Sequence, residues 1–232
     1  MTIHPVALDL AAAQETTSQD PFTLQNKKLL KVLLQYGPIK AALGSMVAYQ
    51  GDAKFEYAGS GGAAKWLKSK LTGEGQKLMT VQGTGEVFLA DMGKDIQVMY
   101  LENDSVSVNG ASILAHSASI DGDIHLVGGA GAMAGGMWNV VLSGTGYVAV
   151  TTDGPPVVLD VASAPTFADP NAVVMWTSGV TMNIKADVNL KTLIGKGSGE
   201  TFQMAFGGQG WVMVQPSEGY TQGGGQGTGV GM

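Results

Sequence analysis

Apolar and polar residues alternate along most of the chain, which is the pattern of β-strands that bury one face. Residues 138–143 read WNVVLS, and residues 201–206 read TFQMAF. Two segments have a more helical spacing. The leucines within residues 29–34 recur four positions apart, although residues 22–34 fit two short strands equally well, and residues 63–71 could form two helical turns. The pattern predicts an all-β protein with at most one or two short helices.

A Gly-x-Gly motif recurs three times, at residues 83–85, 144–146 and 208–210. Each copy lies between two segments with strand-like alternation. A further strand-like segment precedes each copy at a similar distance, at residues 45–49, 112–116 and 172–176. The recurrence predicts three related strand-rich units within one domain, at about residues 39–100, 101–160 and 161–217.

The motif glycines are predicted to mark the corners of a rolled sheet. Glycine accepts a positive φ without steric cost, so a strand bends or bulges most readily where glycine occurs. The six predicted corner residues are Gly83, Gly85, Gly144, Gly146, Gly208 and Gly210. The same alignment places His116 at the position of Tyr49 and Trp176, which predicts that its ring fills a half-buried position.

The strand pattern extends from about residue 21 to about residue 217. Residues 1–20 have weak periodicity, and residues 218–232 are rich in glycine without apolar alternation, so both segments are predicted to be flexible. Residues 21–217 then form a single β domain. The first twenty residues contain neither a basic segment nor a sustained apolar one, and we therefore expect a cytoplasmic protein.

The composition removes several classes of function. All 13 basic residues are lysine and the net charge is −6, so the arginine forks that read nucleic acid are absent. Without cysteine the chain has no disulfide, no thiolate nucleophile and no cysteine-based zinc site. Its three histidines offer little for a pair of nucleophile and base. We expect a protein that binds no nucleic acid, requires no cofactor and is not an enzyme.

Asp121, Asp123 and His125 are the best candidates for a metal site. Alternate residues of a strand face the same side, so the strand would present two carboxylates and an imidazole together. The set spreads over roughly 13 Å, however, which is wide for one ion. The favoured interpretation is a solvated strand end with a turn at residues 121–122.

Three connecting segments within the units carry apolar residues next to lysines. If a rotation relates the units, these segments meet near one end or face of the domain. The candidate interaction residues are Lys65, Trp66, Leu67, Lys68, Lys70, Leu71, Met133, Met137, Leu190, Lys191, Leu193 and Ile194. An apolar surface rimmed by lysine suits a protein partner or an anionic membrane surface. Ordinary packing of these segments on the core is the alternative.

Six short blocks follow one another along the chain, at residues 44–51, 71–75, 83–90, 112–115, 142–146 and 207–210. In this order and spacing they resemble the altered inheritance of mitochondria 24 family, a mitochondrial biogenesis family. The resemblance implies a fold similar to the trp RNA-binding attenuation protein, a double-stranded β-helix or jelly-roll-like barrel of antiparallel sheets. For mitochondrial members it implies association with the inner membrane and with the complex that shapes cristae, whereas bacterial members have no established activity. A fold does not by itself bring RNA binding with it.

Two hypotheses about function follow. The first is a non-enzymatic β-scaffold or interaction protein that forms homo-oligomers and contacts a protein partner or the periphery of a membrane. The second is a small-ligand or metal-binding jelly-roll, with Asp121, Asp123 and His125 or an interior pocket as its site.

Overall fold

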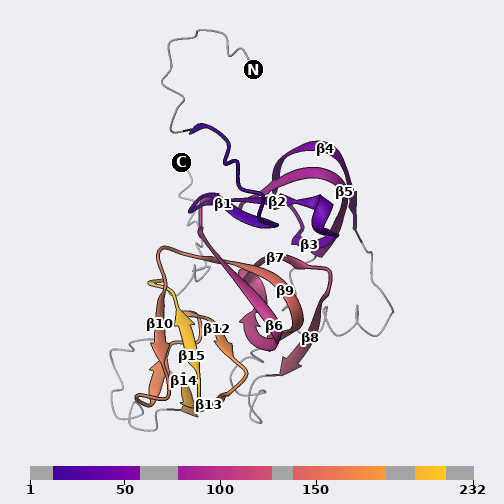
Figure 1. The fold of residues 1–232 in the computed structure, drawn as a ribbon. Coiled ribbons are helices and arrows are strands. Elements are labelled where there is room, and N and C mark those ends of the chain that lie inside the picture. Colours follow the sequence, from indigo (N-terminus) through magenta and orange to yellow (C-terminus); the bar gives the residue numbers. More distant parts are fainter. Residues whose placement is uncertain (1–12, 58–77, 127–137, 187–201, 218–232) are drawn as a thin grey trace, which may run out of the picture.

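The structure is a computed structural model that describes residues 13–57, 78–126, 138–186 and 202–217 (Figure 1). Its elements are β1 (Phe22–Asn26), β2 (Leu29–Leu33), η2 (Leu34–Tyr36), β3 (Ile39–Ala42), β4 (Met46–Glu56), β5 (Leu78–Leu89), β6 (Asp95–Asn109), η3 (Gly110–Ser112), β7 (Ile113–Ser117), β8 (Ile120–Leu126), β9 (Trp138–Thr152), β10 (Val157–Asp160), β11 (Thr166–Ala168), β12 (Val173–Thr177), β13 (Val180–Ala186), β14 (Phe202–Gly208) and β15 (Trp211–Val214).

The strands form antiparallel sheets that pack as a jelly-roll-like β-sandwich, which confirms the predicted all-β class. The two short η elements are single turns of 3-10 helix. Within the described residues the sheets stay open instead of closing into the predicted barrel, because the strands at their ends pair on one side only.

Residues 22–34 form a strand pair followed by a 3-10 turn. β1 and β2 run antiparallel, and β2 pairs on its other edge with β5. Both faces of β2 are covered, since Leu30, Lys31, Val32 and Leu33 are all buried. A strand that is buried on both faces has consecutive apolar residues instead of alternation, which explains why the leucine spacing fits a helix equally well. The possible helix at residues 63–71 lies outside the described residues.

The three units share one pairing register. In each unit a first strand, which is the beginning of β4, β7 or β12, pairs with the part of a long strand that follows the Gly-x-Gly motif. The long strands are β5, β9 and β14 continued by β15. The central pairs are Tyr49 with Val87, His116 with Val148, and Trp176 with Val212. In every unit the register shifts once within the first strand, between Met46 and Ala48, between Ile113 and Ala115, and between Val173 and Met175.

Each unit also has a leading strand, and the first two of these strands join their unit to the next. The leading strands are β3, the last part of β6, and β11, and their pairs with their own long strands are Ile39 with Val81, Val106 with Leu142, and Thr166 with Phe206. On its other edge, β3 pairs with β7 of the second unit, and β6 pairs with β12 of the third. The units therefore follow one another in a row, with the first at one end of the molecule and the third at the other (Figure 1).

The core consists of three apolar clusters, and a first strand also reaches into the cluster of the unit before it. Leu114 and Ala115 of β7 belong to the cluster that surrounds Leu30 in the first unit. Val174 and Met175 of β12 belong to the cluster of the second unit. The junctions between units are thus parts of the core, formed by strand pairing and apolar burial together.

All six motif glycines have a positive φ, from +99° to +154°. A Cβ atom at Gly83 would lie 2.1 Å from the carbonyl oxygen of Asp52 on the paired strand. The β4–β5 pair bends so strongly here that the rings of Tyr49 and Phe55, both on β4, meet edge to face with centres 5.3 Å apart. β5 and β9 continue through their motifs, whereas the third long strand is interrupted between β14 and β15.

Candidate functional site

The first strand of the first unit exposes apolar residues where its counterparts bury them. Val47 is 61% exposed, whereas Leu114 and Val174 at the same position of the other units are 1% and 0% exposed. Met46 and Tyr49 are 38% and 49% exposed as well. The difference follows from the row of units, because no leading strand within the described part of the chain pairs with the outer edge of β4.

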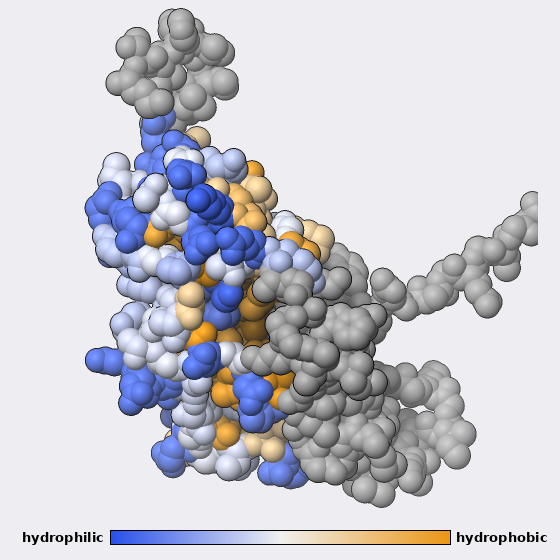
Figure 2. Space-filling view, turned by 90° about the vertical axis from the view of Figure 1, so that its right-hand side faces the viewer, coloured by the Kyte–Doolittle hydropathy of each residue, from blue (hydrophilic) through white to orange (hydrophobic). Residues whose placement is uncertain are grey.

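β11, at the opposite end of the row, is a leading strand without a following unit. It pairs with β14, and among the described residues it has no second partner strand. Phe167 at its centre is half-exposed, and the ammonium nitrogen of Lys185 lies 4.7 Å from the centre of its ring. Figure 2 shows that apolar residues, in orange, reach the surface among hydrophilic ones on one face of the molecule.

A separate apolar surface is a groove of about 350 Å³ between the β1–β2 hairpin and the second unit. Phe22, Tyr36, Tyr100 and Tyr147 form its aromatic lining. Phe22 stacks on Tyr147 with ring centres 5.2 Å apart, and Tyr100 meets the ring of Tyr147 edge-on at 5.0 Å. Serine and threonine residues contribute to the remaining wall. Flat aromatic rings beside hydroxyl groups suit a small amphipathic ligand.

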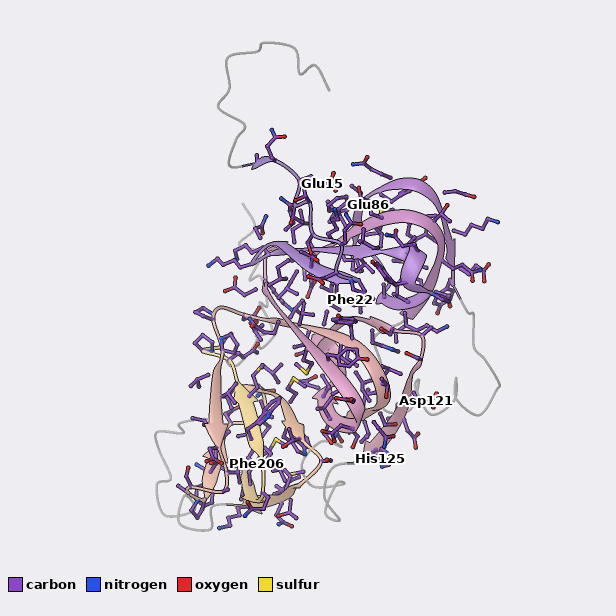
Figure 3. All side chains as sticks on the ribbon, in the orientation of Figure 1. Glu15, Phe22, Glu86, Asp121, His125 and Phe206 are labelled. Atoms are coloured by element: carbon purple, nitrogen blue, oxygen red, sulfur yellow. The ribbon has the colours of Figure 1, made fainter. Side chains whose placement is uncertain are left out.

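β8 carries the predicted metal candidates on its exposed side. Oδ2 of Asp123 lies 3.4 Å from Nε2 of His125, and both side chains are more than half exposed. Asp121 is exposed too. Across the described ranges, no group of three histidine, aspartate or glutamate side chains is placed to hold a metal ion. Asp123 and His125 therefore form a solvated pair at the strand surface, and Figure 3 labels Asp121 and His125 on this strand.

His116 is buried and fills the central position of its first strand. Its Nδ1–H donates to the carbonyl oxygen of Ser117 at 2.9 Å. Burial lowers the pKa of His116, the hydrogen bond to Ser117 opposes that change, and the nearby ammonium of Lys40 lowers the pKa further. The lowered pKa favours the neutral imidazole. Its counterpart Trp176 is buried as well, so the position is filled by a ring in both units.

The twelve candidate interaction residues of the connecting segments lie outside the described residues. They belong to residues 58–77, 127–137 and 187–201, which follow β4, β8 and β13 and precede the long strand of each unit. The predicted contact with a protein partner or a membrane surface stays a prediction.

Lys31 is a buried charge that sequence reasoning missed. Its ammonium donates to Oε1 of Glu15 at 2.6 Å and to the carbonyl of Thr16 at 2.9 Å, and it pairs with Oε2 of Glu86 at 3.0 Å. Figure 3 labels the two glutamates. Burial alone lowers the pKa of Lys31, but the two glutamates raise it above its ordinary value. The hydrogen bond from Lys31 in turn lowers the pKa of Glu15.

Residues 14–16 are consequently held against the β1–β2 hairpin. The side chain of Gln25 accepts from the backbone N–H of Thr16 at 2.7 Å and donates to the carbonyl of Gln14 at 2.8 Å. The sequence pattern predicts a flexible segment over residues 1–20, and it gives no indication that residues 14–16 make these contacts. The signal in the sequence was a lone lysine, Lys31, within a run of apolar residues.

Two comparisons with known proteins found a similar family or structure. The sequence profile of the family described as mitochondrial biogenesis AIM24 matches residues 22–217. No curated protein matches the chain. A crystal structure from Streptococcus pyogenes, a structural genomics target, superposes with a TM-score of 0.68 at 20% identity and covers 84% of this chain and 92% of that one. This likeness shows the fold alone.

The described part of the chain has no helix long and apolar enough to cross a membrane. The family match covers all of the described strands and includes the three Gly-x-Gly motifs. The chain belongs to the mitochondrial biogenesis AIM24 family.

Proposed function

We propose that this protein is a non-enzymatic β-scaffold that works by associating with further copies of itself. The observation that carries the proposal is the exposed first strand of the first unit. Val47 lies in solvent at a position that a buried apolar residue fills in both other units. Burying a side chain of this size contributes about 1.5–3 kcal/mol. A strand with an unpaired edge is also a template for pairing with another chain.

The proposal extends to location and further partners. We propose a cytoplasmic protein that works at the periphery of a membrane and binds neither nucleic acid nor a cofactor. The net charge of −6 and the lack of arginine support the exclusion of nucleic acid. The lysine-rimmed apolar residues of the connecting segments support contact with a protein partner or anionic lipid.

Light scattering coupled to size-exclusion chromatography tests the self-association. The wild-type protein is expected to have a mass above that of the monomer, rising with concentration. Val47→Glu places a charge on the exposed first strand and should return the protein to the monomer. Leu24→Glu, at an exposed apolar position of β1, is the matched control and should leave the association unchanged. A wild-type protein that stays monomeric up to its highest soluble concentration contradicts the proposal.

The second candidate function is binding of a small ligand in the aromatic groove. The exposed rings of the groove favour it, because Tyr36 and Tyr100 are more than half exposed beside serine and threonine residues. A thermal-shift screen with metabolites and metal ions tests it, with Tyr100→Ala as the groove variant. A compound that stabilises the wild type but not Tyr100→Ala supports this function, and a screen without any stabilising compound counts against it.

A further inference from the structure

We propose that β11 of one copy pairs antiparallel with the beginning of β4 of a second copy, with Phe167 opposite Tyr49. Ala168 then lies opposite Ala48, and Thr166 lies opposite Gln50. This inference rests on the self-association proposed above and names its two surfaces. The exposed first strand of one molecule would be covered by the unpartnered leading strand of another.

The two junctions inside the chain supply the register. At the first junction β3 pairs with β7 through Lys40 and His116. At the second junction β6 pairs with β12 through Ser107 and Trp176. At both junctions, the leading strand and the first strand are each also paired with the long strand of their own unit. The register of these pairs with the long strand is the same in all three units. Carrying the internal register over to β11 and β4 gives the pairs stated above.

The side chains of the exposed first strand match the same arrangement. At each internal junction, two consecutive apolar residues enter the core of the preceding unit, as Leu114 and Ala115 do at the first and their counterparts in β12 do at the second. Val47 and Ala48 are the corresponding residues of β4, and both are exposed. In the proposed pairing they enter the apolar cluster of a third unit, which contains Phe206.

The receiving strand is likewise less covered than its counterparts. Ala41 in β3 and Val108 in β6 are fully buried, since a first strand lies against each of them. Ala168 in β11 is only partly buried, although it packs against the cluster of the third unit. One end of the row thus has a first strand without a leading strand beside it, and the other end has a leading strand without a first strand. Each end offers the strand that the other lacks.

The pairing joins two molecules and is heterologous. β4 lies at one end of the molecule and β14, the partner of β11, lies at the other (Figure 1). Because each copy has one strand of each kind, the contact repeats head to tail. It generates a ring if the rotation between copies closes and an open chain if it does not.

Cysteine cross-linking tests the register, since the natural chain has no cysteine. Gln50→Cys and Thr166→Cys, mixed as two single variants, place thiols at one predicted cross-strand pair. Under mild oxidation they should form a mixed disulfide dimer at least about tenfold faster than Gln50→Cys mixed with Ser163→Cys, because a disulfide needs Cα atoms within about 7 Å. Ser163 is an exposed residue shortly before β11 and serves as the matched control.

The outcomes separate this inference from the proposed function. Gln50→Cys that cross-links equally fast with Thr166→Cys and with Ser163→Cys would overturn the register. Gln50→Cys that cross-links fastest with itself would also overturn it, because that result indicates two-fold pairing of β4 strands. If the wild type associates by light scattering and either result is found, only this inference fails. If the wild type is monomeric, both fail. Circular dichroism of each variant verifies that the strand content is retained.

Discussion

Gly83→Ala tests whether the motif glycines make the bend of the β4–β5 pair possible. Gly83 has a φ of +130°, and an added Cβ would lie 2.1 Å from the carbonyl oxygen of Asp52. A backbone in this region costs a residue other than glycine about 1–3 kcal/mol. Relieving the overlap also requires the strands to separate, and the loss of two ladder hydrogen bonds adds about 2 kcal/mol. We expect a loss of about 3–5 kcal/mol in the free energy of unfolding.

Gly44→Ala is the control that separates the two contributions. Gly44 has a φ of +88°, but an added Cβ would meet no atom within 4 Å. The backbone cost of about 1–2 kcal/mol is partly offset by the reduced entropy of the unfolded chain, which leaves a loss of about 1 kcal/mol. Urea unfolding followed by circular dichroism measures both variants, with the slope against urea verified to be unchanged. Equal losses in the two variants would refute the role of close strand approach at Gly83.

Two further predictions concern pH. The lowered pKa of Glu15 means that its contact with Lys31 contributes stability above pH 4.5, lost as the pH falls through the folded-state value. In urea unfolding, Lys31→Met should remove this dependence of stability on acid pH. At neutral pH it should lower the free energy of unfolding by about 1–3 kcal/mol, because Glu86 loses its partner. An acid dependence that is the same in the variant and the wild type would contradict the contact. The pKa of His116 in the folded protein is lowered from 6.5. As the pH falls below 6.5, the unfolded chain therefore binds a proton at this residue before the folded protein does. The free energy of unfolding then decreases by at most about 1.4 kcal/mol per pH unit. His116→Gln should abolish that slope, and a slope retained in the variant would assign it to another group.

The arrangement of the units could be predicted from the sequence because its signals are local. The Gly-x-Gly motif and the alternation around it occur within a few residues, and the alignment of Tyr49, His116 and Trp176 coincides with the observed pairing to the long strands. β2 was ambiguous because burial on both faces removes alternation. The open ends of the row could not be predicted, since pattern alone does not tell whether the last unit meets the first.

The candidate surfaces depend on tertiary structure and left little trace in the sequence. Val47 and Leu114 have the same apolar character and the same place in their units, and only the row of units makes one exposed and the other buried. The aromatic groove combines Phe22, Tyr100 and Tyr147 from three separate strands. Sequence reasoning instead favoured the connecting segments, because apolar residues beside lysines form a visible local pattern.

Hydrogen exchange of the wild-type protein as a function of its concentration tests self-association through the two ends most directly. The account predicts that the backbone amides of residues 46–50 in β4 and 166–168 in β11 become protected together as the concentration rises. Those of residues 22–26 in β1 should exchange at the same rate throughout. Exchange in β4 and β11 that is independent of concentration, in a protein that associates by light scattering, would contradict the account.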